Sequence, residues 1–190
     1  MLYQPGERPP SQPAPRINWR DLYNEWLKPF LITLVLIAII NLFFPRYEVL
    51  GHSMEPGLHE RDRLFVSNLD VMTTDRLERG QVVVLSSPVD GTIVVKRIIG
   101  LPGETVEVRA GQVYVNGEAL DEPYINEAPR YHGEWTLGAD EYFVLGDNRN
   151  HSYDSADYGA VTRDHIQGVV KLRLWPLDAL GGFAAPDYEG

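Results

Sequence analysis

The chain has 190 residues, which allows one modest domain. It contains no cysteine, so disulfide bonds and thiolate metal sites are excluded. The formal net charge is −10, and residues 46–190 hold 13 Lys and Arg against 24 Asp and Glu. An acidic domain of this kind argues against nucleic acid as the partner.

The N-terminal segment is predicted to be a disordered and interfacial tail over residues 1–26. Its first 15 residues contain five prolines and few apolar side chains, so they cannot bury a core. The segment from Trp19 to Lys28 then carries three aromatic and two basic residues, a composition that suits a membrane interface. The basic residues of this tail favour a cytoplasmic location for it.

One transmembrane helix is predicted at residues 27–45. The uncharged run from Pro29 to Pro45 is dominated by Leu, Ile, Val and Phe, and it is at the short limit for a bilayer span. Leu27 and a snorkelling Lys28 can extend it. A cleavable signal peptide is disfavoured, because the preceding segment is too long and no small-x-small cleavage site follows. A buried core helix is the remaining alternative, although the run has no polar face at helical spacing.

After Arg46 the pattern changes to short runs rich in β-branched residues, separated by turn signals. A short helical piece near residues 75–77 is the one possible exception. The pattern indicates a mainly β fold, an antiparallel sheet or barrel, over residues 46–183, with residues 184–190 as a C-terminal tail. Strands are predicted at residues 63–67, 81–85, 93–99, 142–145 and 168–175, with a hairpin at 105–117.

Three stretches carry residues that suit nucleophilic catalysis. Gly51 and Pro56 bracket a tight turn that contains Ser53, although a serine in a turn is by itself usually only a turn residue. Lys96 lies inside an apolar strand pattern, and a dense polar loop follows at residues 146–155. A serine nucleophile needs a base, and a desolvated lysine can serve as one.

Burial is what would leave this lysine neutral, and so able to accept a proton. A lysine normally titrates near ~10.4, and an apolar setting can lower its pKa by about 3–5. Strand alternation places Lys96 on one face and Arg97 on the other, but the periodicity does not tell which charge points inward. An arginine cannot act as the base, because it stays protonated.

Four motifs follow in order behind the apolar segment. They are Ser-Met-x-Pro from Ser53, Asp-Arg-Leu from Asp62, Lys-Arg-x-x-Gly-Leu-Pro-Gly from Lys96, and Gly-Asp-Asn-x-x-x-Ser-x-Asp-Ser from Gly146. In this combination the chain resembles the type I signal peptidases, a family of membrane-bound Ser–Lys proteases, over about residues 27–180. The resemblance implies a coiled β catalytic core with a small β excursion inserted at about residues 104–141.

The resemblance also implies roles for single residues. Ser53 would be the nucleophile, Lys96 the general base, and Ser152 a second serine that orients the lysine amine. We interpret three further polar residues as structural, holding the loop through Asx-type hydrogen bonds: Asp147, Asn148 and Asp154.

Details near the nucleophile are less defined by the motifs. The Ser53 backbone N–H is a candidate donor to the oxyanion, and Gly51 excludes a side-chain donor two residues earlier. Met54 is a candidate wall of the nearest substrate pocket, and Gly51 is a second candidate for substrate binding. Family members commonly have arginine at the position of Ala156, where it pairs with the loop aspartate. Arg149 and Arg163 are candidates to substitute for it, and the sequence does not choose between them.

The function implied is a membrane-bound serine endopeptidase that removes signal peptides from exported preproteins, with a preference for Ala-x-Ala. The expected location is the bacterial cytoplasmic membrane, with the N-terminus inside and the catalytic domain on the outer face. Preproteins and membrane lipid are the expected partners of a monomer. No cofactor or metal is expected, since the five histidines lack ligand spacing. Alternatives are a self-cleaving Ser–Lys protease of the repressor or mutagenesis type, and a non-enzymatic membrane-anchored β module.

Overall fold

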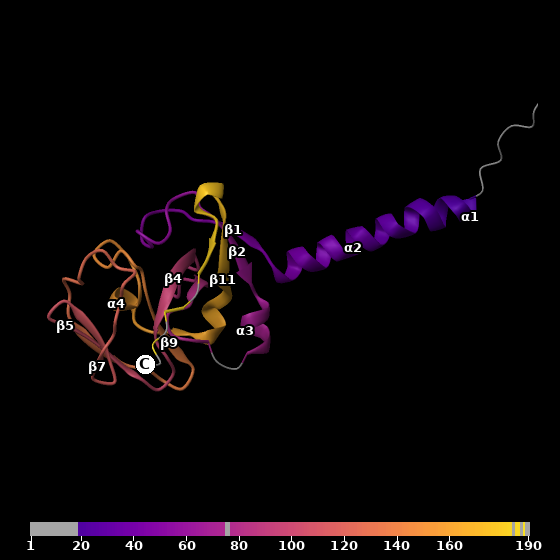
Figure 1. Ribbon diagram of the computed structural model, residues 1–190. Helices are drawn as coiled ribbons and strands as arrows, with labels where there is room; N and C mark the ends of the chain where they lie inside the picture. Colours follow the sequence, from indigo (N-terminus) through magenta and orange to yellow (C-terminus); the bar gives the residue numbers. More distant parts are fainter. Residues whose placement is uncertain (1–18, 75–76, 184, 187, 189–190) are drawn as a thin grey trace, which may run out of the picture. The chain divides into compact units, whose positions relative to one another are not determined.

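The computed structural model describes residues 19–74, 77–183, 185, 186 and 188 (Figure 1). The predicted fold class is confirmed: the chain is mainly antiparallel β with one N-terminal apolar helix. By packing, the chain divides into a unit of residues 1–40 and a unit of residues 41–190.

The N-terminal helix runs from Trp19 to Phe43. It consists of α1 (Trp19–Leu22), a π-helical segment η1 (Tyr23–Leu27) and α2 (Lys28–Phe43). The π-helical segment lies just before Pro29, whose ring cannot donate to an α-helical partner, and the N–H of Lys28 bonds to the carbonyl of Tyr23. A helix of 25 residues is about 37 Å long, so by length and composition it could cross a membrane. It begins well before the predicted boundary at residue 27, because the aromatic segment is itself helical.

The larger sheet has the strand order β1-β2-β11-β3-β4-β9-β10, with β12 paired to β11, among the residues that are described. All of these pairs are antiparallel. The predicted strands are confirmed to within about two residues at each end. Their bounds are β1 Arg46–Glu48, β2 Arg63–Ser67, β3 Val82–Ser86, β4 Ile93–Gly100, β9 Glu141–Leu145, β10 Val161–Thr162, β11 Ile166–Trp175 and β12 Gly181–Gly182.

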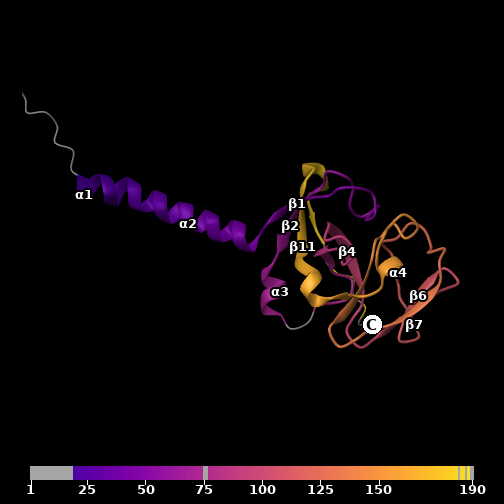
Figure 2. The same ribbon diagram turned by 180° about the vertical axis from the view of Figure 1, so that it is seen from behind.

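A smaller antiparallel sheet is inserted between β4 and β9, with the order β7-β6-β5-β8. The predicted hairpin is its β5–β6 pair, and its turn residues Ala110 and Gly111 both have positive φ, as a tight two-residue hairpin turn requires. Figures 1 and 2 show this sheet at one end of the β unit, and β1, β2 and α3 at the other. Its strands are β5 Thr105–Arg109, β6 Gln112–Val115, β7 Glu118–Ala119 and β8 Gly133–Thr136.

Short helical segments occur between the strands. They are α3 Leu69–Thr73, α4 Ser155–Tyr158, and the 3₁₀ turns η2 Arg163–His165 and η3 Leu177–Ala179. The helical piece predicted near residues 75–77 falls partly on residues 75 and 76, which lie outside the described ranges. The helix that is present, α3, ends at Thr73, before that prediction begins.

The two sheets share a core that fixes the strands leading to the polar loop. Ile99 of β4 and Phe143 and Leu145 of β9 are fully buried against apolar residues of the small sheet. The Trp135 ring packs on Phe143 with 4.7 Å between ring centroids. Burying each such side chain contributes about 1.5–3 kcal/mol, so the small sheet holds β4 and β9 firmly from one side.

Candidate active site

Strand β4 places two neighbouring cationic side chains in the interior. Lys96 is 3% exposed and Arg97 is 5% exposed. The strand is paired with β3 on one edge and β9 on the other, and apolar side chains cover both of its faces. Both charges therefore point inward, which strand alternation alone left open.

The Lys96 amine contacts the second serine of the polar loop. Its Nζ donates to the Ser152 Oγ at 3.0 Å. Burial lowers the pKa of Lys96 below its ordinary value, and the nearby carboxylates Asp154, Asp147 and Asp157 only partly oppose this. A lysine in this setting releases its proton at a lower pH than an exposed one, so it can accept a proton from a nucleophile.

Arg97 points to the opposite face of β4 from Lys96 and pairs with Asp147. Its Nε and Nη2 donate to the two carboxylate oxygens at 2.8 and 2.7 Å, and its Nη1 donates to the carbonyl of Gly80 at 2.8 Å. The Asp147 carboxylate was expected to make Asx-type bonds within the loop, and the structure instead commits both of its oxygens to this buried pair. A buried guanidinium needs such a partner, because an unpaired charge would be costly in the interior.

Ser53 lies in a turn whose backbone is tied to the polar loop. The Ser53 carbonyl accepts a bond from the Asn148 backbone N–H at 3.0 Å, and the Asn148 side chain donates to the carbonyl of His52 at 3.1 Å. Gly51 begins the turn with φ 85°, a conformation that favours glycine. Asn148 thus ties the turn that contains Ser53 to the loop that carries Ser152.

Met54, expected as a pocket wall, is packed in the core instead. Its side chain is 2% exposed and lies in a cluster with Val49, Leu58 and Leu64. An apolar side chain next to a tight turn gains more from burial than from exposure, so Met54 anchors the turn and presents almost no surface to a bound peptide.

Gly146 begins the fourth motif, but the motif assigned it no role. A Cβ atom at this position would collide with the Ser152 side chain and with the Ser53 backbone carbonyl. The backbone of residue 146 therefore fills the space between the turn that contains Ser53 and the Ser152 side chain. The glycine itself was visible in the sequence, but its neighbours Ser53 and Ser152 come from segments about 100 residues apart.

Asp154 closes the loop at the start of α4. It accepts bonds from the backbone N–H groups of Gly146 at 2.8 Å and Ala156 at 3.1 Å, and the Asp157 carboxylate accepts from the Asp154 N–H in return. Burial raises the pKa of Asp154, while these backbone bonds act against that effect. This reciprocal capping box fixes the end of the loop.

Arg149 does not take the place of the family arginine beside Asp154. It forms a buried ion pair with Glu122, with Nη1 donating to Oε2 at 2.8 Å. Arg163, the other candidate, donates to the carbonyls of Val71 and Thr74.

A further ion pair supports the segment that follows Ser53. Asp62 is buried and accepts bonds from the His59 N–H and from Arg173 Nη1, both at 3.0 Å. The same Arg173 nitrogen donates to the carbonyl of Gly57 at 3.1 Å. The Asp-Arg-Leu motif thus contributes through its aspartate, which joins β11 to the turn.

The histidines next to the motifs have other partners. His52 Nδ1 lies 2.8 Å from the Glu55 carboxylate, and His151 Nδ1 lies 3.2 Å from the Asn148 side-chain oxygen. Within the described part of the chain, no group of three or more His, Asp or Glu side chains is arranged to hold a metal ion.

The sequence was compared with protein families and with known proteins. The model of the family described as signal peptidase, peptidase S26, matches residues 23–175. The chain belongs to the signal peptidase family. A signal peptidase I from Bacillus amyloliquefaciens is 40% identical over 169 residues, covering 82% of this chain and 90% of the relative. A probable signal peptidase I-2 from Synechocystis is 41% identical, covering 83% and 77%.

Two further relatives extend the comparison. A signal peptidase I from Leptolyngbya laminosa is 37% identical and covers 95% of this chain and 94% of its own length. A crystal structure of a signal peptidase I from Enterococcus faecalis is 37% identical, covers 49% of this chain and 95% of that chain, and superposes with a TM-score of 0.46.

These findings decide the class of activity. The chain is a serine endopeptidase of the signal peptidase family, and its N-terminal apolar helix fits a membrane-anchored enzyme. They favour this class over a self-cleaving repressor-type protease and over a non-enzymatic β module.

Proposed function

We propose that this signal peptidase cleaves by a Ser–Lys dyad, with Ser53 as the nucleophile and Lys96 as the general base. One observation carries the proposal: the Lys96 amine is almost fully buried and donates to the Ser152 hydroxyl at 3.0 Å. Of the two cations on β4, Arg97 pairs with the Asp147 carboxylate, whereas the Lys96 amine meets a hydroxyl and can act without its proton. Ser152 orients the amine toward the nucleophile turn.

In the reaction, the Ser53 Oγ attacks the scissile carbonyl while neutral Lys96 takes the hydroxyl proton. Collapse of the tetrahedral intermediate breaks the peptide C–N bond, and the Lys96 ammonium returns that proton to the leaving amine. Water then hydrolyses the acyl-enzyme, with Lys96 again as base. The Ser53 backbone N–H is our assigned donor to the oxyanion.

The proposed substrates are preproteins that bind as an added extended strand, with small side chains before the cut. Support comes from Gly51, where an added Cβ would meet no atom within 4 Å, so the backbone beside the nucleophile is open to a peptide. The expected Ala-x-Ala preference follows from the family.

We place the enzyme as a monomer in the bacterial cytoplasmic membrane. Residues 1–26 form the cytoplasmic tail, 27–45 the span, 46–183 the catalytic domain on the outer face, and 184–190 the C-terminal tail. Four basic residues up to position 45 and the acidic balance of residues 46–190 support this orientation. Lipid is then the second partner, and the inserted excursion spans about residues 104–141.

Cleavage of a preprotein by the purified full-length enzyme tests the dyad. Ser53→Ala and Lys96→Arg should both lose at least about 10²-fold in rate, because general-base catalysis contributes about 10²–10⁴-fold and a guanidinium keeps its proton. The kcat/KM of the unaltered enzyme should rise with pH through the lowered pKa of Lys96. Equal folding is checked by circular dichroism, and efficient cleavage by Lys96→Arg would disprove the assignment.

A further inference from the structure

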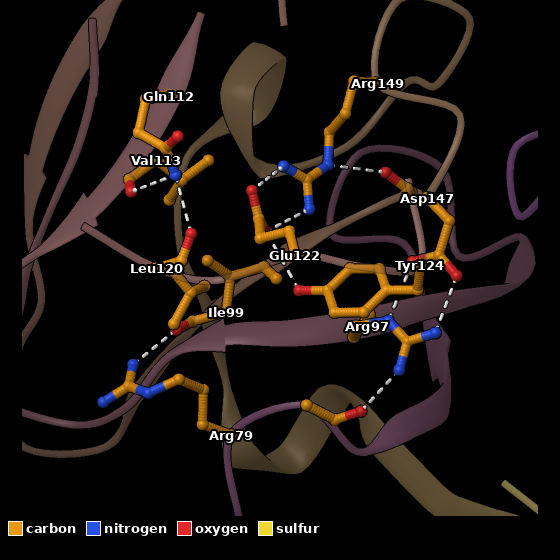
Figure 3. Close-up of polar contacts among 12 residues, drawn as sticks. Arg79, Arg97, Ile99, Gln112, Val113, Leu120, Glu122, Tyr124, Asp147 and Arg149 are labelled. Atoms are coloured by element: carbon orange, nitrogen blue, oxygen red, sulfur yellow. Dashed lines mark hydrogen bonds and ion pairs between the residues drawn. The ribbon is translucent and has the colours of Figure 1, made fainter. Parts of the chain in front are cut away.

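Tyr124, in the connection between β7 and β8, contacts the buried Arg97 directly and the buried Arg149 through Glu122 (Figure 3). The Arg97 guanidinium carbon lies 3.9 Å from the centroid of the Tyr124 ring. The Tyr124 hydroxyl donates to Glu122 Oε1 at 2.9 Å, and Glu122 pairs with Arg149. One side chain of the inserted segment therefore contacts two separate charged groups at once.

The second arginine reaches the loop at a different point from the first. Arg149 Nε donates to the carbonyl of Gly146 at 3.1 Å, and its side chain is fully buried beside Glu122. Arg97 holds the adjacent residue Asp147 through two bonds. Residues 146 and 147, which directly precede the Asn148 bonds to the nucleophile turn, are thus held by two guanidinium groups.

The C-terminal segment completes this arrangement from outside. The Tyr188 hydroxyl donates to the Tyr124 hydroxyl at 3.0 Å. Pro186 and Tyr188 also lie so close to Gly80 that a Cβ there would collide with both. The carbonyl of Gly80 accepts a bond from Arg97. The C-terminal segment therefore packs on two residues that contact Arg97, namely Gly80 and Tyr124.

We infer that Tyr124 is a positioning residue for cleavage, holding the loop of residues 146–149 in register with Ser53 and Lys96, and that Tyr188 keeps Tyr124 in place. The inference rests on the proposed Ser–Lys function. Its physical basis is exclusion of water: the aromatic ring covers one face of a buried guanidinium, and cation–π contacts of this kind strengthen when they are desolvated.

Loss of the ring has a defined sequence of effects. Water reaches Arg97, the pair with Asp147 loosens, and the loop shifts relative to β4. The Ser152 hydroxyl then no longer meets the Lys96 amine in a fixed geometry, and Lys96 becomes better solvated. Burial raises the pKa of Tyr124, so its hydroxyl stays a donor to Glu122 across the pH range of an assay.

The test measures kcat, KM and pH profile of the full-length enzyme in detergent with a short soluble signal-peptide substrate. Tyr124→Leu should lower kcat about 10²-fold with KM unchanged within about twofold, and it should move the midpoint of the pH profile upward. Tyr124→Phe keeps the ring and should lose about tenfold or less, as should Tyr188→Phe. The matched control is Tyr114→Leu, because Arg109 lies over the Tyr114 ring at 4.0 Å in the same small sheet, away from the loop.

Hydrogen exchange of the amides of residues 146–155 provides a readout that does not depend on activity. These amides should exchange faster in Tyr124→Leu than in Tyr114→Leu. If Tyr124→Leu keeps the pH midpoint and loses rate only in proportion to unfolded protein, Tyr124 is merely structural and the inference is wrong. If Ser53→Ala cleaves at the unaltered rate, the proposed function fails, whatever Tyr124 does.

Discussion

At the scale of single residues, burial of Lys96 should lower the free energy of unfolding by an amount that depends on pH. Its pKa in the folded protein is lowered by burial, whereas in the unfolded chain it is near ~10.4. Between these two values the unfolded chain binds more protons, so the free energy of unfolding falls as pH decreases from about 10.4 to the lowered pKa. Below that pKa the penalty is constant.

Lys96→Met should therefore raise the melting temperature at pH 7 and raise it less at pH 10.5. Calorimetry at the two pH values measures the difference. Ser152→Ala at the same pH values serves as the control for losing the 3.0 Å hydrogen bond between the two side chains. An equal change in melting temperature at both pH values would show that the charge of Lys96 does not destabilise the folded protein.

Ser152→Ala should reduce activity far more than stability. One lost hydrogen bond costs on the order of 1 kcal/mol of unfolding free energy, while a misaligned base costs about 10²-fold in rate. Turnover of a peptide substrate and a urea unfolding curve measure the two effects. Normal turnover would mean that Ser152 is only a turn residue.

Gly146→Ala should inactivate the enzyme by moving two segments apart. The added methyl group collides with Ser152 and with the Ser53 carbonyl, and such overpacking costs about 1–3 kcal/mol. Gly181→Ala is the control, because a Cβ there meets only one atom, at 3.9 Å. If peptide cleavage by Gly146→Ala equals that of the control, the loop tolerates displacement and the described geometry is not required.

Residue roles near the proposed dyad could be predicted only where a motif named the residue. Ser53, Lys96 and Ser152 were assigned from the motif set, and the structure brings Lys96 and Ser152 together. The environment of Arg97 and the burial of Met54 were not predictable, because each depends on partners far away in the chain. Strand periodicity gives a side for each residue but not what covers that side.

At the scale of elements, the capping box of α4 should contribute measurably to the loop. Asp157→Ala removes the acceptor for the Asp154 backbone N–H, which should cost about 0.5–2 kcal/mol. Activity should fall as well, because Asp154 holds the Gly146 N–H. Asp164→Ala, an exposed acidic residue in η2, should change neither unfolding free energy nor turnover. Equal behaviour of the two variants would contradict this role for the capping box.

The strands were the most predictable elements, because runs of β-branched residues ended at Gly, Pro and Asn turns. The β5–β6 hairpin followed from its Ala-Gly turn. Helix starts were less predictable. The aromatic residues after Trp19 suited an interface equally well whether helical or extended, and α3 is too short to show a periodic pattern.

At the scale of the whole molecule, the β unit should work without the span. A protein starting at Asn41 keeps the bond from the Asn68 N–H to the Phe43 carbonyl and the stacking of Phe44 on Phe65 at 5.0 Å. It should cleave short soluble peptides like the full-length enzyme. Preproteins inserted in vesicles should be processed at least about tenfold more slowly, because the span no longer concentrates the enzyme at the membrane. If the truncated protein processes vesicle-inserted preproteins at the full-length rate, the proposed role of the helix is wrong.

Because successive side chains of β4 point to opposite faces, the order of Lys96 and Arg97 in the sequence matters. Two positive side chains stand next to each other, and the strand delivers one to a hydroxyl and the other to a carboxylate. Exchanging them, Lys96→Arg with Arg97→Lys, keeps composition, net charge and strand pattern. The exchanged protein would hold a permanent cation where a proton must leave, and a removable proton where a permanent cation is needed. We expect the exchanged protein to be less stable and inactive in peptide cleavage. The order of these two residues along β4, rather than their presence, should therefore decide whether the protein cleaves peptides.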